Sequence, residues 1–360
     1  MKISKKNLVT TTFGEVAIQQ KADIDRNSHA VDRYIAGEHM NSEDLHIRQW
    51  GVFSGQYLGP AFRRKFEKGD ILYGSRRTYL KKVAVVDFDG ITANTTFVIK
   101  PNKERICPEL LPFLMLSDSF TRHSIKHSKG SVNPYINWKD IANYEFKLPP
   151  LIDEQKRIAD LLWSIDDTIE SYAKILNRLS IAYLIELKNI FAVKGDEKKI
   201  GDVAYLHYGD GLREKDRRDG CYLVIGSSGV VGKHAECRVK GPGIVVGRKG
   251  SAGEVLWIEE DFWPIDTTYW VEIKNREYMS MEYFYYVLKS LNLPSLAITT
   301  AVPGLNRDDV LLKAIRVPEL SVQSRVVERF RSIQFVKDDV NKHILNTKNI
   351  QKQIINQIFG

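Results

Sequence analysis

Two stretches of the chain decide its fold, because each predicts one long helix and the two are copies of each other. The first, residues 150–191, reads PLIDEQKRIADLLWSIDDTIESYAKILNRLSIAYLIELKNIF. The second, residues 318–359, reads PELSVQSRVVERFRSIQFVKDDVNKHILNTKNIQKQIINQIF. They align without a gap at an offset of 168 residues, with identities that include Pro150 and Pro318, Gln155 and Gln323, Arg157 and Arg325, and Phe191 and Phe359. Such a repeat indicates a duplicated architecture.

Each stretch carries an apolar stripe with the spacing of a coiled-coil helix. In the first copy the steps alternate between four and three residues, through Ile158, Leu162, Ile165, Ile169, Tyr172, Leu176, Leu179 and Tyr183. The second copy is interrupted by Lys337, Thr347 and Gln351, and keeps the stripe at Val326, Phe330, Ile333, Val340, Ile344, Ile355 and Ile358. At about 1.5 Å per residue each stripe predicts a helix of roughly 50 Å. We expect the stripes to pack against each other; the alternative is two ordinary amphipathic helices in separate domains.

The regions before each helix also echo each other. Phe13-Gly14-Glu15-Val16-Ala17 matches Ile200-Gly201-Asp202-Val203-Ala204. Short β-branched and aromatic runs between Gly and Asn turns predict mostly strands, with short helices at 110–116 and 281–288. We therefore predict an α+β chain in four parts, at residues 1–148, 149–194, 195–316 and 317–360.

Composition places the chain among ordinary packed proteins. Apolar residues make up 43% of it, and no run of about 18 apolar residues predicts a membrane span. The three cysteines, Cys107, Cys221 and Cys237, favour a reducing cytoplasm and have no zinc-site spacing. The polar N-terminus does not predict a secretory signal.

The positive charge is uneven along the chain. The formal net charge is +8, with 23 Lys and Arg against 16 Asp and Glu in residues 1–148, but 17 against 18 in residues 195–316. A basic excess favours a nucleic-acid partner. In the second half such a partner would have to contact local basic clusters.

One segment resembles a known family. Leu148-Pro149-Pro150-Leu151 followed by Glu154-Gln155 is similar to the entrance of the central spacer helix in specificity subunits of type I restriction–modification systems. The repeat is degraded at Val317-Pro318-Glu319-Leu320, where Val322 replaces the Glu of the pair. Residues 226–232, 247–253 and 261–268 also resemble segments of the family's target-recognition domains.

The resemblance implies two mostly-β target-recognition domains separated by two long antiparallel coiled-coil helices, related by a pseudo-two-fold repeat. It implies that each domain reads one half of a split site in double-stranded DNA. The helices would set the spacing and dock two methyltransferase subunits, which restriction subunits join. Candidate helix-pairing or docking residues are Ile158, Leu162, Ile165, Ile169, Leu176, Val326, Phe330, Ile333, Val340 and Ile344. It implies no catalytic site and no cofactor in this chain.

Basic clusters supply the candidate DNA contacts. Lys and Arg neutralise phosphates, and Arg can also grip guanine in bidentate fashion. The candidates are Arg63, Arg64, Lys65, Arg76, Arg77, Tyr79 and Lys81 in the first region, and Arg213, Arg217, Arg218, Arg248 and Lys249 in the second. We favour Arg76 and Arg77 for base contact, because they follow a Gly74-Ser75 turn. The alternative is that these residues simply form a solvent-exposed basic surface without a ligand.

Several motifs imitate catalytic sites. Asn133-Pro134-Tyr135 resembles part of an adenine-methyltransferase motif, but no glycine-rich cofactor loop precedes it. Asp266, Glu272 and Lys274 imitate a metal-dependent nuclease, and a stand-alone nuclease is our main alternative function. A scaffold that does not touch DNA is a third. His123 and His127 could share a helix face, but no third metal ligand is evident.

Overall fold

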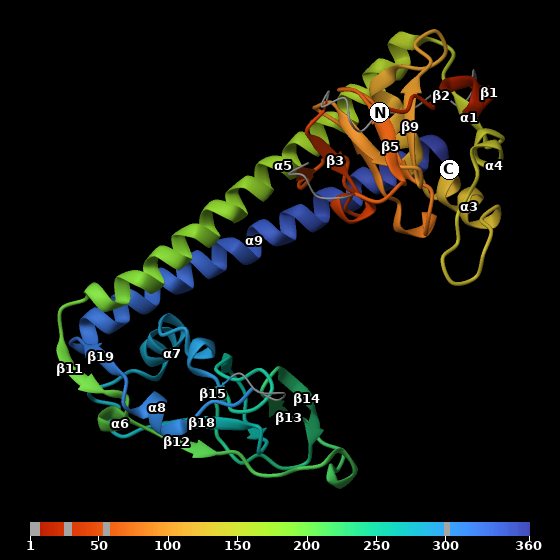
Figure 1. The fold of residues 1–360 in the computed structure, drawn as a ribbon. Coiled ribbons are helices and arrows are strands. Elements are labelled where there is room, and N and C mark those ends of the chain that lie inside the picture. Colours follow the sequence, from red (N-terminus) through yellow and green to blue (C-terminus); the bar gives the residue numbers. More distant parts are fainter. Residues whose placement is uncertain (1–7, 25–30, 53–57, 299–302) are drawn as a thin grey trace. The chain divides into compact units, whose positions relative to one another are not determined.

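The computed structural model describes residues 8–24, 31–52, 58–298 and 303–360. The chain forms two compact units, the first from residues 1–173 with 342–360 and the second from residues 174–341. Each unit combines a region of strands with parts of both long helices (Figure 1). The four-part division predicted from the sequence therefore stays a prediction.

The two long helices are α5 (Ile152–Asn189) and α9 (Leu320–Phe359). In the first unit the Tyr172 and His343 rings stack with centroids 5.4 Å apart, and Gln351 Nε2 lies 3.3 Å from the Leu162 carbonyl oxygen. In the second unit the Tyr183 ring meets Phe330 edge-on at 5.2 Å. In the first unit residue numbers fall along α5 as they rise along α9, so the helices run antiparallel there. The expected pairing of the two helices is confirmed.

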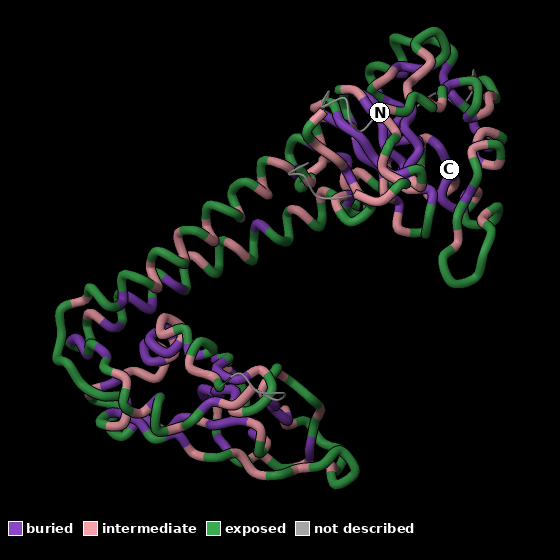
Figure 2. Tube along the Cα trace, in the orientation of Figure 1, coloured by how far each residue is buried: buried purple, intermediate pink, exposed green. Residues whose placement is uncertain are grey.

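The apolar stripes face the interior in both units. Ile158, Leu162 and Ile169 are buried on α5, as are Val326, Phe330 and Val340 on α9. Ile355 is buried too, the remaining stripe positions are half-buried, and even the interrupting residues are not fully exposed. Figure 2 shows the opposite, exposed face of each helix in green. The step of four and three therefore identified the packed face correctly.

The described residues of the first unit form two four-stranded sheets and one strand pair. One sheet has the order β2-β9-β6-β7, the other β4-β3-β8-β5, and β1 pairs with β10. The strands are β1 (Val9–Thr12), β2 (Ala17–Gln20), β3 (Arg33–Ile35), β4 (Gly51–Val52), β5 (Phe62–Phe66), β6 (Ile71–Gly74), β7 (Val83–Val85), β8 (Gly90–Ala93), β9 (Thr96–Pro101) and β10 (Glu145–Leu148). The helices are α1 (Phe13–Val16), α2 (Leu111–Leu116), α3 (Asp118–Lys126) and α4 (Trp138–Ala142), with 3-10 turns η3 (Gly37–His39), η4 (Thr78–Leu80) and η5 (Pro108–Leu110).

The second unit repeats this plan. Its sheets have the orders β12-β18-β15-β16 and β14-β13-β17, and β11 pairs with β19. The strands are β11 (Asp196–Lys199), β12 (Ala204–Tyr208), β13 (Tyr222–Gly226), β14 (Gly229–His234), β15 (Gly243–Gly247), β16 (Val255–Ile258), β17 (Phe262–Pro264), β18 (Thr268–Ile273) and β19 (Ala314–Val317). The helices are α6 (Ile200–Val203), α7 (Met281–Ser290) and α8 (Arg307–Leu311), with 3-10 turns η6 (Ile190–Ala192), η7 (Glu214–Asp216) and η8 (Leu293–Leu296).

A buried glutamine anchors the start of α5 to the first unit, and an equivalent glutamine anchors the start of α9 to the second unit. Gln155 Oε1 accepts a hydrogen bond from the Cys107 amide at 2.7 Å, and Gln323 Oε1 accepts one from the Ser280 amide at 2.8 Å. Gln155 also donates to the Pro149 carbonyl oxygen and Gln323 to that of Pro318, both at 2.8 Å. A buried amide needs such partners on both its oxygen and its nitrogen. This anchor explains why glutamine stands at the same place in both copies.

In the first unit, residues 41–48 cover one face of α5. His46 Nε2 lies 2.6 Å from Asp166 Oδ2, and Arg48 Nη1 donates to Glu170 Oε2 at 2.7 Å. The hydrogen bond with Asp166 raises the pKa of His46 above its usual 6.5, and the Glu170 carboxylate raises the pKa of Arg48. This covering segment is therefore held by paired opposite charges.

The His46 contact makes the covering segment pH-sensitive. Folding raises the pKa of His46, so its contribution to the stability of the segment is fully present below the unfolded-state pKa of 6.5. This contribution is lost as the pH rises through the folded-state pKa. We expect amide exchange in residues 41–48, corrected for intrinsic rates, to increase a few-fold between about pH 6 and about pH 8. Hydrogen-exchange mass spectrometry measures this. His46→Gln should remove the pH dependence, and an unchanged pH response in that variant would contradict the assignment.

No helix in the described parts of the chain is long and apolar enough to cross a membrane.

Candidate nucleic-acid interface

The loop after β6 forms the centre of the candidate site in the first unit. The Gly74 amide donates to the Lys82 carbonyl oxygen at 2.9 Å and closes the loop. Residues 129–136 pack beside this loop and pair with it through two backbone hydrogen bonds. The Arg77 amide donates to the Pro134 carbonyl oxygen at 2.7 Å, and the Ile136 amide donates to the Ser75 carbonyl oxygen at 2.9 Å.

The loop after β15 in the second unit has the same hydrogen bonds. The Gly247 amide donates to the Glu254 carbonyl oxygen at 2.8 Å, the Gly250 amide to that of Pro303 at 3.1 Å, and the Leu305 amide to that of Arg248 at 2.9 Å. Arg77 therefore corresponds to Gly250. We call these two structures the paired loops, residues 74–82 with 129–136 and residues 247–254 with 303–305.

Arg77 and Lys81 both have a left-handed backbone in this loop. The φ of Arg77 is +50°, and the equivalent Gly250 has a φ of +78°. Glycine adopts this left-handed conformation at little cost, whereas another residue pays roughly 1–2 kcal/mol. Backbone strain of this kind is enriched at functional sites, and in this loop it occurs at the exposed Arg77 as well as at the buried Lys81.

The first loop presents exposed cationic and aromatic side chains. Arg76, Arg77 and Tyr79 are exposed, and Tyr79 keeps 53% of its accessible surface. Arg77 Nε donates to Asn133 Oδ1 at 3.2 Å. Tyr135 is 43% exposed on the neighbouring segment. The loop can therefore offer guanidinium groups and an aromatic ring to one ligand.

Lys81 does not belong to this exposed group. It is 8% exposed, and its ammonium group contacts Asp118, Glu43 and the Leu116 carbonyl oxygen. Although burial alone would raise the pKa of Asp118, the Lys81 ammonium keeps it below its usual value. The charge of Lys81 is therefore used inside the unit, which makes it a weaker candidate for DNA contact than Arg76 and Arg77.

Arg63, Arg64 and Lys65 lie on β5, in the other sheet of the first unit. Both arginines pair with Asp23 at 3.1 Å, and Lys65 pairs with Glu67 at 2.9 Å. The sequence grouped these residues with Arg76 and Arg77, but the structure places them on a different element with neutralising partners.

In the second unit Arg248 is part of the paired loop itself. Its Nη1 donates to the Asp266 carbonyl oxygen at 2.9 Å, and its guanidinium lies 4.9 Å from the Tyr208 ring centroid. Arg307 approaches the same ring at 5.1 Å. Lys249 is exposed next to them. Together they form a basic and aromatic cluster.

Arg213, Arg217 and Arg218 surround η7 and are held by local contacts. Arg213 pairs with Asp216 at 2.6 Å, Arg218 with Glu236 at 2.5 Å, and Arg217 Nη1 donates to the Val231 carbonyl oxygen at 2.7 Å. Their charges are thus less available than that of Lys249.

The sequence did not identify every residue at the paired loops. Tyr208 and Arg307 carried no signal as contacts, because they lie far from Arg248 in sequence. Asn133-Pro134-Tyr135 did carry one, as a methyltransferase-like motif. In the structure this motif instead contacts Arg77, through the Pro134 carbonyl oxygen and the Asn133 side chain.

The geometry does not support the nuclease alternative. Glu272 Oε2 contacts His207 Nε2 at 2.7 Å, and Lys274 Nζ donates to the Gly201 carbonyl oxygen at 2.5 Å. Among the described residues no group of three or more His, Cys, Asp or Glu could hold a metal ion. Asp266, Glu272 and Lys274 therefore do not come together as a metal site in the described part of the chain.

Comparison with known proteins now identifies the family. The model of the type I restriction modification DNA specificity domain matches residues 20–180 and again residues 192–349. The chain belongs to this family. The double match agrees with the repeat, and the expectation of a non-catalytic specificity subunit is confirmed by this membership.

Two curated relatives are specificity subunits of type I restriction enzymes. The HindI subunit of Haemophilus influenzae is 26% identical over 170 residues, covering 46% of this chain and 36% of the relative. The EcoDI subunit of Escherichia coli is 31% identical over 133 residues, covering 35% and 29%. The matched part thus spans about a third of each relative's length.

Solved structures share the fold across almost the whole chain. One, from work on complex assembly and conformational transition of the type I restriction–modification system, has a TM-score of 0.66 at 18% identity and covers 98% of this chain and 97% of the other. The type I specificity subunit of M. genitalium has a TM-score of 0.62 at 15% identity, covering 100% and 98%. At these identities the likeness concerns the fold alone.

Proposed function

We propose that each unit of this specificity subunit reads one half of a split DNA site through its paired loops. The observation that carries the proposal is the equivalence of the two loops, which share three backbone hydrogen bonds and present Arg77 in one unit and Arg248 with Lys249 in the other. Arginine and lysine can both contact guanine in the major groove, and both neutralise phosphates. The chain would thus supply recognition and leave catalysis to its partners.

We further propose that α5 and α9 set the distance between the half-sites. Half-sites one turn of DNA apart are about 34–36 Å from each other, and a pair of unbroken helices can hold two reading units at a fixed separation. Both helices run through both units, so a change in their length would change that separation.

The exposed faces of the helices suit partner subunits. Leu184 and Ile185 on α5 are 57% and 52% exposed, and Leu345 on α9 is 61% exposed. Exposed apolar residues on long helices favour contacts with other chains. We propose that two methyltransferase subunits dock here and that restriction subunits join the complex.

Shortening both helices tests the proposed spacing. Deleting residues 171–177 and 339–345 removes one heptad from each helix and keeps both stripes in register, which shortens each by roughly 10 Å. We expect the complex to bind the original site at least about tenfold more weakly, because one half-site can no longer be reached. Selection from a DNA library with randomised gap lengths measures the preferred spacing.

A matched control separates length from sequence. Reinserting an unrelated heptad with apolar residues at the stripe positions should restore the original spacing. If the shortened subunit still prefers the original gap, the helices do not set the distance.

A further inference from the structure

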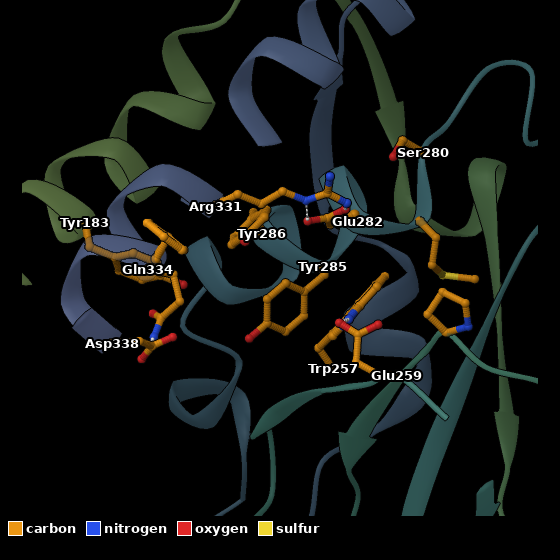
Figure 3. Close-up of a pocket in the computed structure, with 13 residues that line it drawn as sticks. Tyr183, Trp257, Glu259, Ser280, Glu282, Tyr285, Tyr286, Arg331, Gln334 and Asp338 are labelled. Carbon is orange, nitrogen blue, oxygen red and sulfur yellow. Dashed lines mark hydrogen bonds and ion pairs between the residues drawn. The ribbon is translucent and has the colours of Figure 1, made fainter. Parts of the chain in front are cut away.

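The second unit has an open groove between α7, β16 and α9. Its volume is about 810 Å³, and Trp257 and Tyr285 line it (Figure 3). Phe335 also contributes to its wall. Phe335 is 74% exposed, although it is a large apolar residue. The groove is therefore aromatic and unfilled by the described side chains.

Two carboxylates in this groove form no ion pair within the described residues, although Glu259 is near enough to Arg331 to raise its pKa slightly after the larger effect of Glu282. Glu282 is neutralised by Arg331, whose Nε lies 2.6 Å from Glu282 Oε1. Glu259 accepts only from Trp257 Nε1 at 2.8 Å, and Asp338 only from Gln334 Nε2 at 2.9 Å. The groove therefore has a negative charge suited to a basic side chain.

The first unit contains the counterpart of this groove. The anchors Gln155 and Gln323 equate Cys107 with Ser280, which places Glu109 opposite Glu282 in the repeat. Trp163 in the first unit occupies the position of Arg331 in the second. Trp163 Nε1 donates to the Glu109 carbonyl oxygen in the first unit, and Arg331 binds the Glu282 carboxylate in the second. The two sites are thus built on the same plan.

In the first unit part of the counterpart also stays open, as a groove of about 620 Å³ lined by Val85, Glu109 and Trp163. The chain itself covers the adjoining face of α5. The covering segment, residues 41–48, places His46 on Asp166 and Arg48 on Glu170. It also extends the sheet, because the Val85 amide on β7 donates to the Leu45 carbonyl oxygen at 2.9 Å. The molecule itself thus shows that an extended segment with basic side chains fits an acidic helix face beside a strand edge.

Among the described residues, the β13–β14 connection of the second unit is too short to do the same. In the first unit residues 36–50 connect β3 to β4, whereas Ser227 and Ser228 alone connect the equivalent β13 to β14. In the sheet β12-β18-β15-β16, β16 is the last described strand. An unpaired strand edge is a template for pairing with another chain.

We propose that this groove binds an extended, basic segment of a partner protein, which pairs with the free edge of β16 and places an arginine or lysine between Glu259 and Asp338. The partner is a methyltransferase subunit of the complex, and in this respect the inference rests on the proposed function. Main-chain pairing at a strand edge is an established mode of peptide binding. DNA is disfavoured, because the carboxylates repel phosphates. A small cation would leave the Phe335 ring and the strand edge uncovered.

Removing the negative charge tests the groove. The double variant Glu259→Gln, Asp338→Asn keeps the shape of both side chains, and we expect it to weaken methyltransferase-subunit binding by about tenfold or more at one of the two docking positions. Titration calorimetry on the full-length chain measures affinity and stoichiometry. Glu328→Gln is the matched control, since Glu328 is exposed on the same helix but does not line the groove.

A second measurement does not depend on the charge change. A photo-crosslinking phenylalanine analogue at Phe335 should attach to a partner segment that contains an arginine or lysine, and mass spectrometry identifies that segment. If the wild-type chain binds the methyltransferase subunit and the double variant binds it equally, the groove assignment is overturned. A crosslink to DNA or to a non-basic segment would overturn it too. If the wild-type chain binds no methyltransferase subunit, the proposed function fails first, and this inference with it.

Discussion

Ending the chain after Asn341 should unfold the first unit and leave the second folded. Residues 342–360 belong to the first unit, although they lie farthest from it in sequence. Ile355 and Phe359 are each 4% exposed in its core, where Phe359 meets Phe146 at a centroid distance of 6.4 Å. Losing buried side chains of this size costs roughly 2–5 kcal/mol each, against a total stability of about 5–15 kcal/mol.

Polar contacts add to this loss. Asn356 Oδ1 accepts from the Asp118 amide at 2.8 Å, its amide nitrogen donates to the Asp118 carboxylate at 2.7 Å, and Ser119 Oγ donates to the Phe359 carbonyl oxygen at 2.6 Å. Hydrogen-exchange mass spectrometry should show β6 and β9 unprotected in the truncated chain, with β15 and β18 still protected. Phe359→Ala should give a milder form of the same defect, and Ile350→Ala should give none, because Ile350 is 52% exposed. Full protection of β6 and β9 after truncation would show that the last helix is dispensable for this unit.

The sequence predicted the repeated plan because the plan depends on periodic burial. The stripe from Ile158 to Tyr183 recurs at the spacing that one face of a helix requires, and the structure places that face inward. The short helices expected at 110–116 and 281–288 are α2 and α7 for the same reason. What the sequence did not reveal is that residues 342–360 complete the first unit, since long-range packing of this kind leaves no local pattern.

The candidate site was predictable only in part. The Arg76-Arg77 pair was found because it follows a Gly74-Ser75 turn, but composition could not distinguish its exposed guanidinium groups from the buried ammonium of Lys81. The difference depends on Asp118 and Glu43, which approach Lys81 from distant parts of the chain. Charge clusters in a sequence therefore mark a region, while the fold decides which charges remain free.

Replacing Arg77 with glycine should separate stability from DNA recognition. Arg77 has a φ of +50°, and the second unit has Gly250 at the equivalent position. The variant relieves a left-handed strain of roughly 1–2 kcal/mol but makes the unfolded chain more flexible, so we expect the free energy of unfolding to stay within about 1 kcal/mol. The guanidinium is lost, and if it contacts a base, affinity for the first half-site should fall by about ten- to a hundredfold. Denaturant titration and DNA binding at several salt concentrations measure the two effects.

Two further variants at the same position identify the kind of contact. Arg77→Lys keeps the charge but loses the bidentate geometry, so a base contact predicts relaxed specificity at one position with an unchanged salt slope. A phosphate contact predicts instead that Arg77→Lys binds almost normally and that Arg77→Gly lowers the salt slope by about one charge for every sequence. Arg63→Ala is the control, because Arg63 is an exposed cation on β5, paired with Asp23. If Arg77→Gly binds the specific site as tightly as the wild-type chain, then the strained arginine is not a reading residue, and the cations of the first paired loop lose their assigned role.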